Sequence, residues 1–290
     1  MKNSFYLNTG IIGLIGHPIK QSYSPFIHNV AIELKKLDYI YLPFDVPSAN
    51  LKNALKGMLA LGYKGFNVTI PHKVNLIPLV HNVSEEASII GAVNTVVNDM
   101  GKLTGYNTDV NGIMETLLPY KDQIANREVT LIGAGGAART IIYVLIRHFK
   151  PEKINLINRT EERAEGLRVY FKDKMRYENF ETFELFPPIV QKILERSKLI
   201  INATPVGMFP DIDDAVTLLD SSFHKDQIVF DLVYNPPKTK LLQMAEAKGV
   251  VCLDGLKMLV YQAAKSFKLW TGEDMPIEEV HKSLQLMILD

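Results

Sequence analysis

The chain has 290 residues, 47% of them hydrophobic, and its 32 Lys and Arg residues are balanced by 32 Asp and Glu. A chain of this length predicts two domains, and its apolar content excludes a disordered protein. A neutral chain has no overall field to attract nucleic acid or an anionic membrane, so we expect neither partner. The single Cys252 excludes an internal disulfide, and no apolar run approaches the ~20 residues that span a bilayer. These features predict a soluble, cytoplasmic protein.

Short apolar runs alternate with amphipathic stretches along the chain. Strands are predicted at residues 10–16, 39–46, 64–70, 92–99, 127–135, 153–158, 198–204, 227–234 and 250–255. Helices are predicted at residues 24–37, 48–62, 107–120, 237–249, 260–270 and 276–288, and one more follows the strand at 127–135. The segment 170–188 is predicted as helix, short strand and loop. This alternation is typical of the α/β class, with mainly parallel sheets covered by helices.

A glycine-rich turn joins a buried strand to an apolar helix in EVTLIGAGGAARTIIYVLIRH, residues 128–148. Gly133, Gly135 and Ala138 match the G-x-G-x-x-[GA] pattern, in which the first glycine makes the turn and the second lets the backbone approach a pyrophosphate. The helix N-terminus then faces the phosphates. A plain tight turn would also fit the glycines alone. The strand before and the helix after them favour a Rossmann-type, dinucleotide-binding domain.

The next strand indicates which dinucleotide binds. An NAD site usually carries Asp or Glu at this strand end, where it binds the ribose 2′-hydroxyl. Here the strand ends at Asn158 and is followed by Arg159, Thr160 and Arg163. Two guanidinium groups and a hydroxyl suit a 2′-phosphate. An ordinary helix start with Thr160 as N-cap explains the threonine but not the missing acid, so the segment predicts NADP over NAD.

Polar residues interrupt the apolar pattern near several strand ends, which is where doubly wound sheets bind ligands. Ser24 is predicted as the N-cap of a helix with Pro25 in its first turn, whereas Ser22 has no such role. Two hydroxyls at a helix start can hold a carboxylate. Other polar residues near strand ends are Asn67, Thr69, Lys73, Asn94 and Asp109. Tyr234, Gly255 and Gln262, from the second half of the chain, are predicted to add a further wall to the same ligand site.

Each of these residues also has an ordinary structural interpretation. Lys73 follows Pro71, which ends a strand, and could be a solvated lysine. Asn94 could be a polar group at a strand edge, and Asp109 could cap the helix after it. The seven His and one Cys form no metal motif, and no G-x-S-x-G elbow is present, so no metal is expected. His17 and His72 sit beside prolines in turns and are interpreted as structural, and Trp270 as packing.

The motifs together identify the chain as similar to the shikimate dehydrogenase family. In chain order they are GHPIKQSYSPFIHN, GFNVTIPHK, GAVNT, GYNTD, GAGGAAR, NRTEER, NATPVGM, DLVYNP and DGLKMLVYQAA, which cover the chain nearly end to end. The resemblance implies reversible, NADPH-dependent reduction of 3-dehydroshikimate to shikimate in chorismate and aromatic amino acid biosynthesis. It also implies a substrate-binding and catalytic domain at 1–112, completed by helices at 258–290, and a Rossmann-type NADP domain at 113–257.

The resemblance also implies a role for individual residues. The catalytic pair falls on Lys73 and Asp109. The substrate residues fall on Ser22, Ser24, Thr69, Lys73, Asn94, Asp109, Tyr234 and Gln262, with the serines at the carboxylate. The cofactor residues fall on Gly133, Ala134, Gly135, Gly136, Ala137, Asn158, Arg159, Thr160, Arg163 and Gly255. One departure is Lys257, where the family usually has a small residue or Pro.

Proton transfer is the part of the expected reaction that falls to the protein. A carboxylate beside Lys73 favours the charged ammonium, which can donate a proton to a developing alkoxide or stabilise it. Two alternatives remain open, namely a quinate/shikimate dehydrogenase that also uses NAD, and a non-catalytic regulator that binds NADP or shikimate. The sequence specifies no oligomeric state, and a homodimer is one option.

Overall fold

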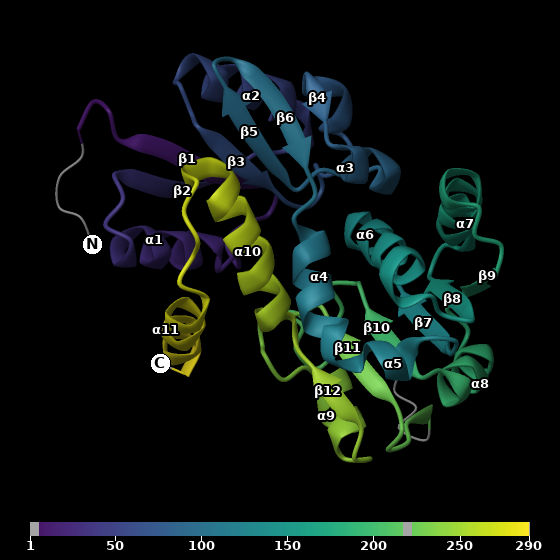
Figure 1. Cartoon of the computed structure of the whole chain (residues 1–290). Coiled ribbons are helices and arrows are strands. Elements are labelled where there is room, and N and C mark those ends of the chain that lie inside the picture. Colours follow the sequence, from purple (N-terminus) through teal and green to yellow (C-terminus); the bar gives the residue numbers. More distant parts are fainter. Residues whose placement is uncertain (1–5, 217–221, 290) are drawn as a thin grey trace. The chain divides into compact units, whose positions relative to one another are not determined.

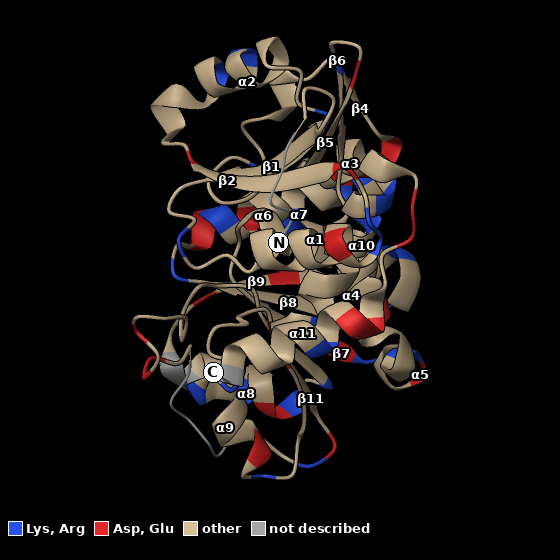
Figure 2. Cartoon of the chain, turned by 90° about the vertical axis from the view of Figure 1, so that its left-hand side faces the viewer, with Lys and Arg blue, Asp and Glu red and all other residues tan. Residues whose placement is uncertain are grey.

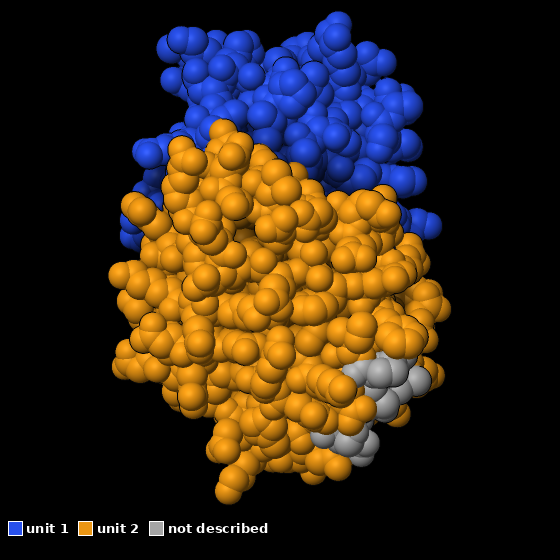
Figure 3. All heavy atoms as spheres, turned by 90° about the vertical axis from the view of Figure 1, so that its right-hand side faces the viewer, with its two compact units in different colours: residues 1–112, 259–290 blue, residues 113–258 orange. Residues whose placement is uncertain are grey.

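A computed structural model describes residues 6–216 and 222–289 (Figure 1). The chain divides into two compact units, coloured separately in Figure 3. Unit 1 comprises Met1–Gly112 and Leu259–Asp290, and unit 2 comprises Ile113–Met258. Acidic and basic residues are interspersed in both units (Figure 2), as expected for a neutral chain.

Unit 1 contains a six-stranded sheet in the order β2-β1-β3-β5-β6-β4. Its strands are β1 (Gly10–Gly16), β2 (Tyr39–Asp45), β3 (Gly65–Val68), β4 (Asn82–Val83), β5 (Thr95–Asp99) and β6 (Lys102–Tyr106). β1 pairs with β2 and β3 in parallel, and β4 pairs with β6 in parallel. β5 runs antiparallel to both β3 and β6. The start of β5 therefore lies beside the end of β3, where Thr95 pairs with Asn67.

Helices cover both faces of this sheet. They are α1 (Ser24–Leu34), α2 (Leu51–Ala60), α3 (Glu85–Ile90) and most of α10 (Gly255–Thr271), with 3₁₀ turns at Ser48–Asn50 and Ile77–Leu79. α11 (Ile277–Leu289) packs against α1. One face packs on α2 and α3 through a core that includes Leu55, Phe66 and Val96. α1 and α10 lie on the other face, where Trp270 donates its indole N–H to the Val96 carbonyl at 2.9 Å. Trp270 is thus a packing residue, as predicted.

Unit 2 contains a wholly parallel six-stranded sheet in the order β12-β11-β10-β7-β8-β9. Its strands are β7 (Glu128–Ile132), β8 (Lys153–Asn158), β9 (Phe180–Glu184), β10 (Leu199–Asn202), β11 (Ile228–Asp231) and β12 (Val251–Leu253). Residues on both faces of the central strands are fully buried, as in other parallel sheets. One face contacts α8 and α9 through residues such as Ile193 and Leu242.

The helices of unit 2 are α4 (Asp109–Leu117, which begins in unit 1), α5 (Lys121–Ile124), α6 (Gly136–Val144), α7 (Glu161–Met175), α8 (Pro187–Arg196) and α9 (Lys240–Glu246). Most of them lie between its strands, whereas α4 and α5 precede β7. A 3₁₀ turn spans Leu118–Tyr120, and a π-helical turn at Leu145–Phe149 extends α6. The α/β class with helix-covered, mainly parallel sheets is confirmed. The sequence did not predict β4 or β6, which form part of the antiparallel and edge region of the first sheet.

A fully buried histidine lies in the core of unit 1. His28 of α1 is fully buried and stacks on Tyr41 with ring centroids 4.3 Å apart. Burial lowers the pKa of His28 to about 3, and the neighbouring Asn67 side chain opposes this shift only in part. His28 is therefore neutral when folded, whereas it titrates near its ordinary value when unfolded.

This difference predicts that unit 1 loses stability in mild acid. Because the unfolded chain binds a proton at His28 that the folded chain does not, the free energy of unfolding falls as pH drops from 6.5 towards 3. The expected loss between pH 6.5 and 5.5 is about 1 kcal/mol from this group. Urea unfolding at both pH values, monitored by Trp270 fluorescence, measures it. His28→Phe should show a smaller pH slope, and an unchanged slope would contradict the assignment.

Candidate functional site

Lys73 and Asp109 form a short ion pair at one edge of the unit 1 sheet. The Lys73 ammonium nitrogen lies 2.5 Å from Asp109 Oδ2, and the two side chains are only 16% and 6% exposed. Lys73 lies in the turn after β3, and Asp109 is the first residue of α4, after β6. The backbone carbonyl of Lys73 accepts the N–H of Val93 at 2.8 Å, which holds the turn beside the start of β5. The fold thus brings together two residues that are 36 positions apart.

Asn94 fixes the other oxygen of the carboxylate. Its Nδ2 donates to Asp109 Oδ1 at 2.8 Å, and its Oδ1 accepts the backbone N–H of Thr108 at 2.7 Å. Because that backbone donor can pair only with the amide oxygen, the amino group of Asn94 must face the carboxylate. Asp109 is therefore held by Lys73 on one oxygen and by Asn94 on the other.

The loop after β1 lies beside the loop after β3. The His17 N–H donates to the Ile70 carbonyl at 2.9 Å. A Cβ placed on Gly16 would lie 2.3 Å from the Thr69 methyl carbon, so only glycine allows this approach. His72 is buried with Nε2 2.6 Å from the Val46 carbonyl oxygen, in keeping with the structural role predicted for it. His17 Nδ1 lies 2.9 Å from Asp45 Oδ1 at the surface.

The two serines of this loop differ from their predicted local roles. The prediction of Ser24 as N-cap is wrong, because α1 begins at Ser24 itself and Tyr23 occupies the N-cap position. Ser22 was predicted to have no capping role, yet its Oγ accepts the Ser24 N–H at 3.3 Å. A hydroxyl one residue before the N-cap can accept a free backbone N–H of the first helical turn, just as a side chain at the N-cap can. The sequence does not show which of the two positions a serine occupies.

Gln262 approaches the same sheet from the C-terminal part of unit 1. It lies on α10, is 7% exposed, and donates Nε2 to the Leu259 carbonyl at 2.8 Å. One turn further along α10, the buried Ser266 hydroxyl contacts Thr95, Thr108 and Asn67. No role for Ser266 or Thr108 was predicted from the sequence. The available signal was a serine four residues after Gln262 on an otherwise apolar helix face.

The glycine loop of unit 2 has the geometry that its sequence pattern requires. Gly133 has φ +106°, and a Cβ there would lie 2.8 Å from the Thr204 methyl carbon. Gly135 is the N-cap of α6, and a Cβ there would meet no atom within 4 Å, so its backbone borders open space. Ala138 is fully buried where α6 packs on the sheet. The first glycine is needed for the turn, and the second leaves the helix N-terminus accessible.

The residues predicted to select the cofactor follow β8, the neighbour of β7 in the sheet. Asn158 Nδ2 donates to the Thr160 carbonyl at 2.7 Å, which orders the turn. Thr160 occupies the N-cap position of α7, although its side chain makes no capping bond to the described helix. Arg159 and Arg163 are exposed at this edge. Two cations are therefore available at the strand end where an NAD site would carry an acid.

The loop after β11 is anchored by a buried carboxyl group. Asp231 accepts hydrogen bonds from Asn202 Nδ2 at 2.9 Å, from the Val233 N–H at 3.0 Å and from Thr239 Oγ1 at 2.7 Å. Burial raises the pKa of Asp231 to about 6, against the opposing effect of these hydrogen bonds. The half-buried Tyr234 follows in this loop. A Cβ on Gly255 would lie 2.3 Å from the Leu232 carbonyl oxygen, so glycine is required where α10 begins.

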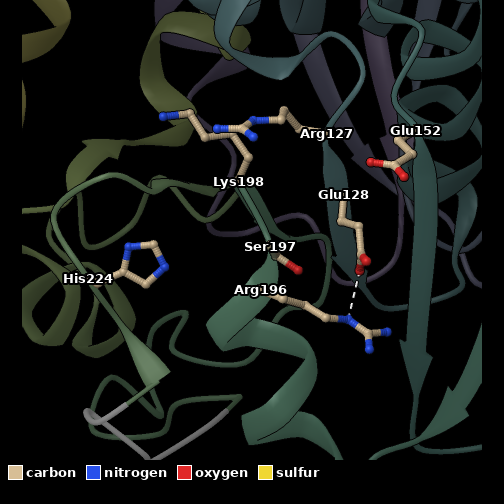
Figure 4. Close-up of a pocket in the computed structure, with 7 residues that line it drawn as sticks. All are labelled: Arg127, Glu128, Glu152, Arg196, Ser197, Lys198 and His224. Carbon is tan, nitrogen blue, oxygen red and sulfur yellow. Dashed lines mark ion pairs between the residues drawn. The ribbon is translucent and has the colours of Figure 1, made fainter.

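A separate surface cavity of about 240 Å³ lies at the amino ends of β7, β8 and β10, whereas the glycine loop follows the carboxyl end of β7 (Figure 4). It is lined by Arg127, Glu128, Glu152, Arg196, Ser197, Lys198 and His224. Arg196 Nε pairs with Glu128 Oε2 at 2.7 Å, so part of its charge is already neutralised. None of the residues predicted for substrate or cofactor lies in this cavity.

The part of the chain that the structure describes holds neither a metal cluster nor a membrane-spanning helix. No group of three or more His, Cys, Asp and Glu residues there is arranged to hold a metal ion. No helix within residues 6–216 and 222–289 is long and apolar enough to cross a membrane.

Family models match three consecutive parts of the chain. The shikimate dehydrogenase substrate binding domain matches residues 14–96, and the shikimate / quinate 5-dehydrogenase model matches residues 116–234. The shikimate 5'-dehydrogenase C-terminal domain matches residues 255–285. Together these matches extend over most of the sequence.

Curated and solved relatives agree with these matches. A protein of Methanopyrus kandleri named shikimate dehydrogenase (NADP(+)) is 42% identical over 278 residues, covering 95% of each chain. The Listeria monocytogenes shikimate 5-dehydrogenase, solved with shikimate and NAD, has a TM-score of 0.86 and 35% identity, covering 98% of this chain and 99% of its own. The Thermus thermophilus shikimate 5-dehydrogenase, solved with NADP(H) and shikimate, has a TM-score of 0.82 and 32% identity, covering 96% and 99%.

The motifs of the sequence, the two α/β units and the relatives along nearly the whole chain agree with one another. The similarity predicted from the motifs is confirmed, and the chain belongs to the shikimate dehydrogenase family.

Proposed function

We propose that this protein catalyses the reversible, NADPH-dependent reduction of 3-dehydroshikimate to shikimate, a step of chorismate and aromatic amino acid biosynthesis. The observation that carries the proposal is the nearly buried pair of Lys73 and Asp109, held at a sheet edge in a chain of this family. A charged pair removed from water is costly unless it is well bonded, and here both carboxylate oxygens are bonded. Such an arrangement suits controlled proton transfer.

Unit 1 provides the groups for substrate binding and proton transfer in this proposal. Lys73 donates its proton to the C3 oxygen during reduction, and Asp109 holds the ammonium in position. Ser22 and Ser24 bind the substrate carboxylate, as donors near the start of α1. The remaining residues that we propose for substrate binding are Thr69, Asn94, Gln262 and Tyr234.

The residues of unit 2 fit NADP. The open space beside Gly135 leaves room for a pyrophosphate at the N-terminus of α6, which Gly133, Ala134, Gly136 and Ala137 adjoin. Arg159 and Arg163 offer charge for a 2′-phosphate, with Asn158 and Thr160 in the same turn and Gly255 at the start of α10. When bound, NADPH supplies the hydride that is added to C3. The role of the chain is to place the reactants and to move the proton.

Substrate binding and cofactor binding are assigned to different segments of the chain. Residues 1–112 with 258–290 form the substrate and catalytic domain, and residues 113–257 form the NADP domain. We place the enzyme in the cytoplasm, where its one thiol stays reduced.

An assay with two substrates and two cofactors tests the proposed activity. Initial rates are measured with shikimate and quinate, each with NADP and NAD, by absorbance of the reduced cofactor. We expect the highest kcat/KM with shikimate and NADP. Comparable values with quinate and NAD would instead identify a quinate/shikimate dehydrogenase. No turnover with any pair, in protein that binds NADP, would identify a non-catalytic binding protein.

A further inference from the structure

Ser266 lies at the centre of a buried group of polar side chains in unit 1. Its Oγ is 2.8 Å from Thr95 Oγ1, 2.9 Å from Thr108 Oγ1 and 3.1 Å from Asn67 Nδ2. Ser266 and Thr95 are fully buried, and Thr108 is almost so. Ser266 comes from α10, whereas its three side-chain partners come from the N-terminal part of the chain. The serine is thus a link between two distant parts of the sequence.

The hydrogen bonds of this group lead directly to the proton-transfer pair. Thr95 Oγ1 and Thr108 Oγ1 both lie within 3.1 Å of Asn94 Oδ1. The same amide donates through Nδ2 to Asp109 Oδ1. A chain of contacts therefore runs from Ser266 through the two threonines to Asn94, and from there to the Asp109 carboxylate.

The other contact of Ser266 leads to Gln262. Ser266 Oγ donates its single proton to the Gln262 carbonyl at 3.1 Å, one turn earlier on α10. With that proton committed, Ser266 Oγ can only accept, through two lone pairs, from its neighbours Thr95, Thr108 and Asn67. Each threonine has a single proton, so one threonine donates to Ser266 while the other donates to Asn94 Oδ1. One hydroxyl thus joins the backbone of Gln262 to the residue that precedes Asp109.

We propose that Ser266 is a positioning residue that sets the placement of Gln262 relative to the Lys73–Asp109 pair. This inference rests on the proposed function, in which Gln262 and the pair contact the same substrate ring. A small error in such placement lowers the rate of the chemical step strongly, because reacting groups must meet within a narrow range of distance. Ser266 itself does not touch the reacting atoms.

Removal of the hydroxyl tests this role. We expect Ser266→Ala to lower kcat for shikimate oxidation about tenfold, with the KM for shikimate changed less than about threefold. Ser266→Cys fills the site but bonds only weakly, so its kcat should fall similarly. A wild-type kcat in Ser266→Cys would show that only packing matters and would overturn the proposal, as would a kcat of Ser266→Ala within twofold of wild type.

Ser197 provides a closely matched control in unit 2. It is almost fully buried, donates Oγ to the carbonyl of Ile193 four residues earlier at 2.7 Å, and lies 2.6 Å from a threonine hydroxyl, that of Thr130. Ser197→Ala therefore loses the same kinds of bond away from the proposed site. Its kcat should stay within about twofold of wild type after correction for folded protein. An equal loss of kcat in both variants would assign the effect to general destabilisation.

A measurement without substrate separates this inference from the proposed activity. The Thr108 amide donates to Asn94 Oδ1, so its hydrogen exchange reports whether the group is intact. We expect faster exchange of this amide in Ser266→Ala and not in Ser197→Ala. If the wild type does not oxidise shikimate, the proposed function fails, and exchange still decides the structural claim. Unchanged exchange of the Thr108 amide in Ser266→Ala would overturn it.

Discussion

Lys73→Ala is expected to lower kcat about 100-fold or more, with a much smaller rise in the KM for shikimate. Lys73 holds the only ammonium bonded to Asp109 among the described residues, and it is the proposed proton donor. Without it, the C3 oxygen has no proton donor during reduction and no proton acceptor during the oxidation of shikimate. Steady-state rates with shikimate and NADP measure the loss. A wild-type kcat in Lys73→Ala would remove this residue from the mechanism.

Controls must separate chemistry from stability, because Lys73→Ala leaves the Asp109 carboxylate buried without its ion-pair partner. Breaking such a pair typically costs about 3–5 kcal/mol of folding free energy. The double variant Lys73→Met/Asp109→Asn removes both charges, so we expect it to recover stability but not kcat. Recovery of both would mean that the single variant lost activity through unfolding. Lys64→Ala, at an exposed lysine just before β3, should keep wild-type activity.

Arg159→Ala is expected to raise the KM for NADP about 10- to 100-fold, the range for a lost hydrogen-bonded contact to a charged group. The KM for NAD should change less than about threefold, because NAD lacks the 2′-phosphate. The preference for NADP would therefore fall mainly through weaker NADP binding. Rates at varied concentrations of each cofactor, with shikimate saturating, measure both values. Equal losses for NADP and NAD would show that Arg159 does not contact the 2′-phosphate.

A second charge removal on the same helix controls for long-range electrostatics. Lys174 is exposed near the far end of α7, about 20 Å along the helix axis from its start. Salt screens exposed charges over about 8 Å at physiological ionic strength. Lys174→Ala should therefore leave the KM for NADP unchanged. A matching rise in Lys174→Ala would attribute the effect to net charge and not to a local phosphate contact.

The glycine loop and the strand end that follows it, which together predict the cofactor, could both be recognised from the sequence. The glycine loop was evident from the strand, turn and helix pattern alone, because its function depends on backbone conformation over a few adjacent residues. The positive φ at Gly133 agrees with that pattern. The sequence also shows that β8 ends at Asn158 and is followed by Arg159, without an acid at the strand end. Both features are local, and local sequence determines local conformation well.

The antiparallel part of the unit 1 sheet could not be predicted from the sequence. β6 contains Gly105 and the exposed Lys102 and offers little apolar alternation, so it was not predicted as a strand. Its pairing with β5 sets Thr95 opposite Tyr106 and so brings Thr108 and Asp109 beside Asn94. The sequence marked Asn94 and Asp109 as polar interruptions. Their hydrogen bond depends on strand register, which tertiary packing selects.

By itself the sequence determined the α/β class, the glycine loop and the motifs that identify the family, because each is encoded in residues close together along the chain. Tertiary structure alone decided which oxygen of Asp109 faces Lys73 and which faces Asn94. It also decided that Ser266 meets Thr95, 171 positions earlier. Contacts of that kind depend on how a whole helix packs on a sheet, and no short pattern of residues encodes the direction of a side chain across such a distance.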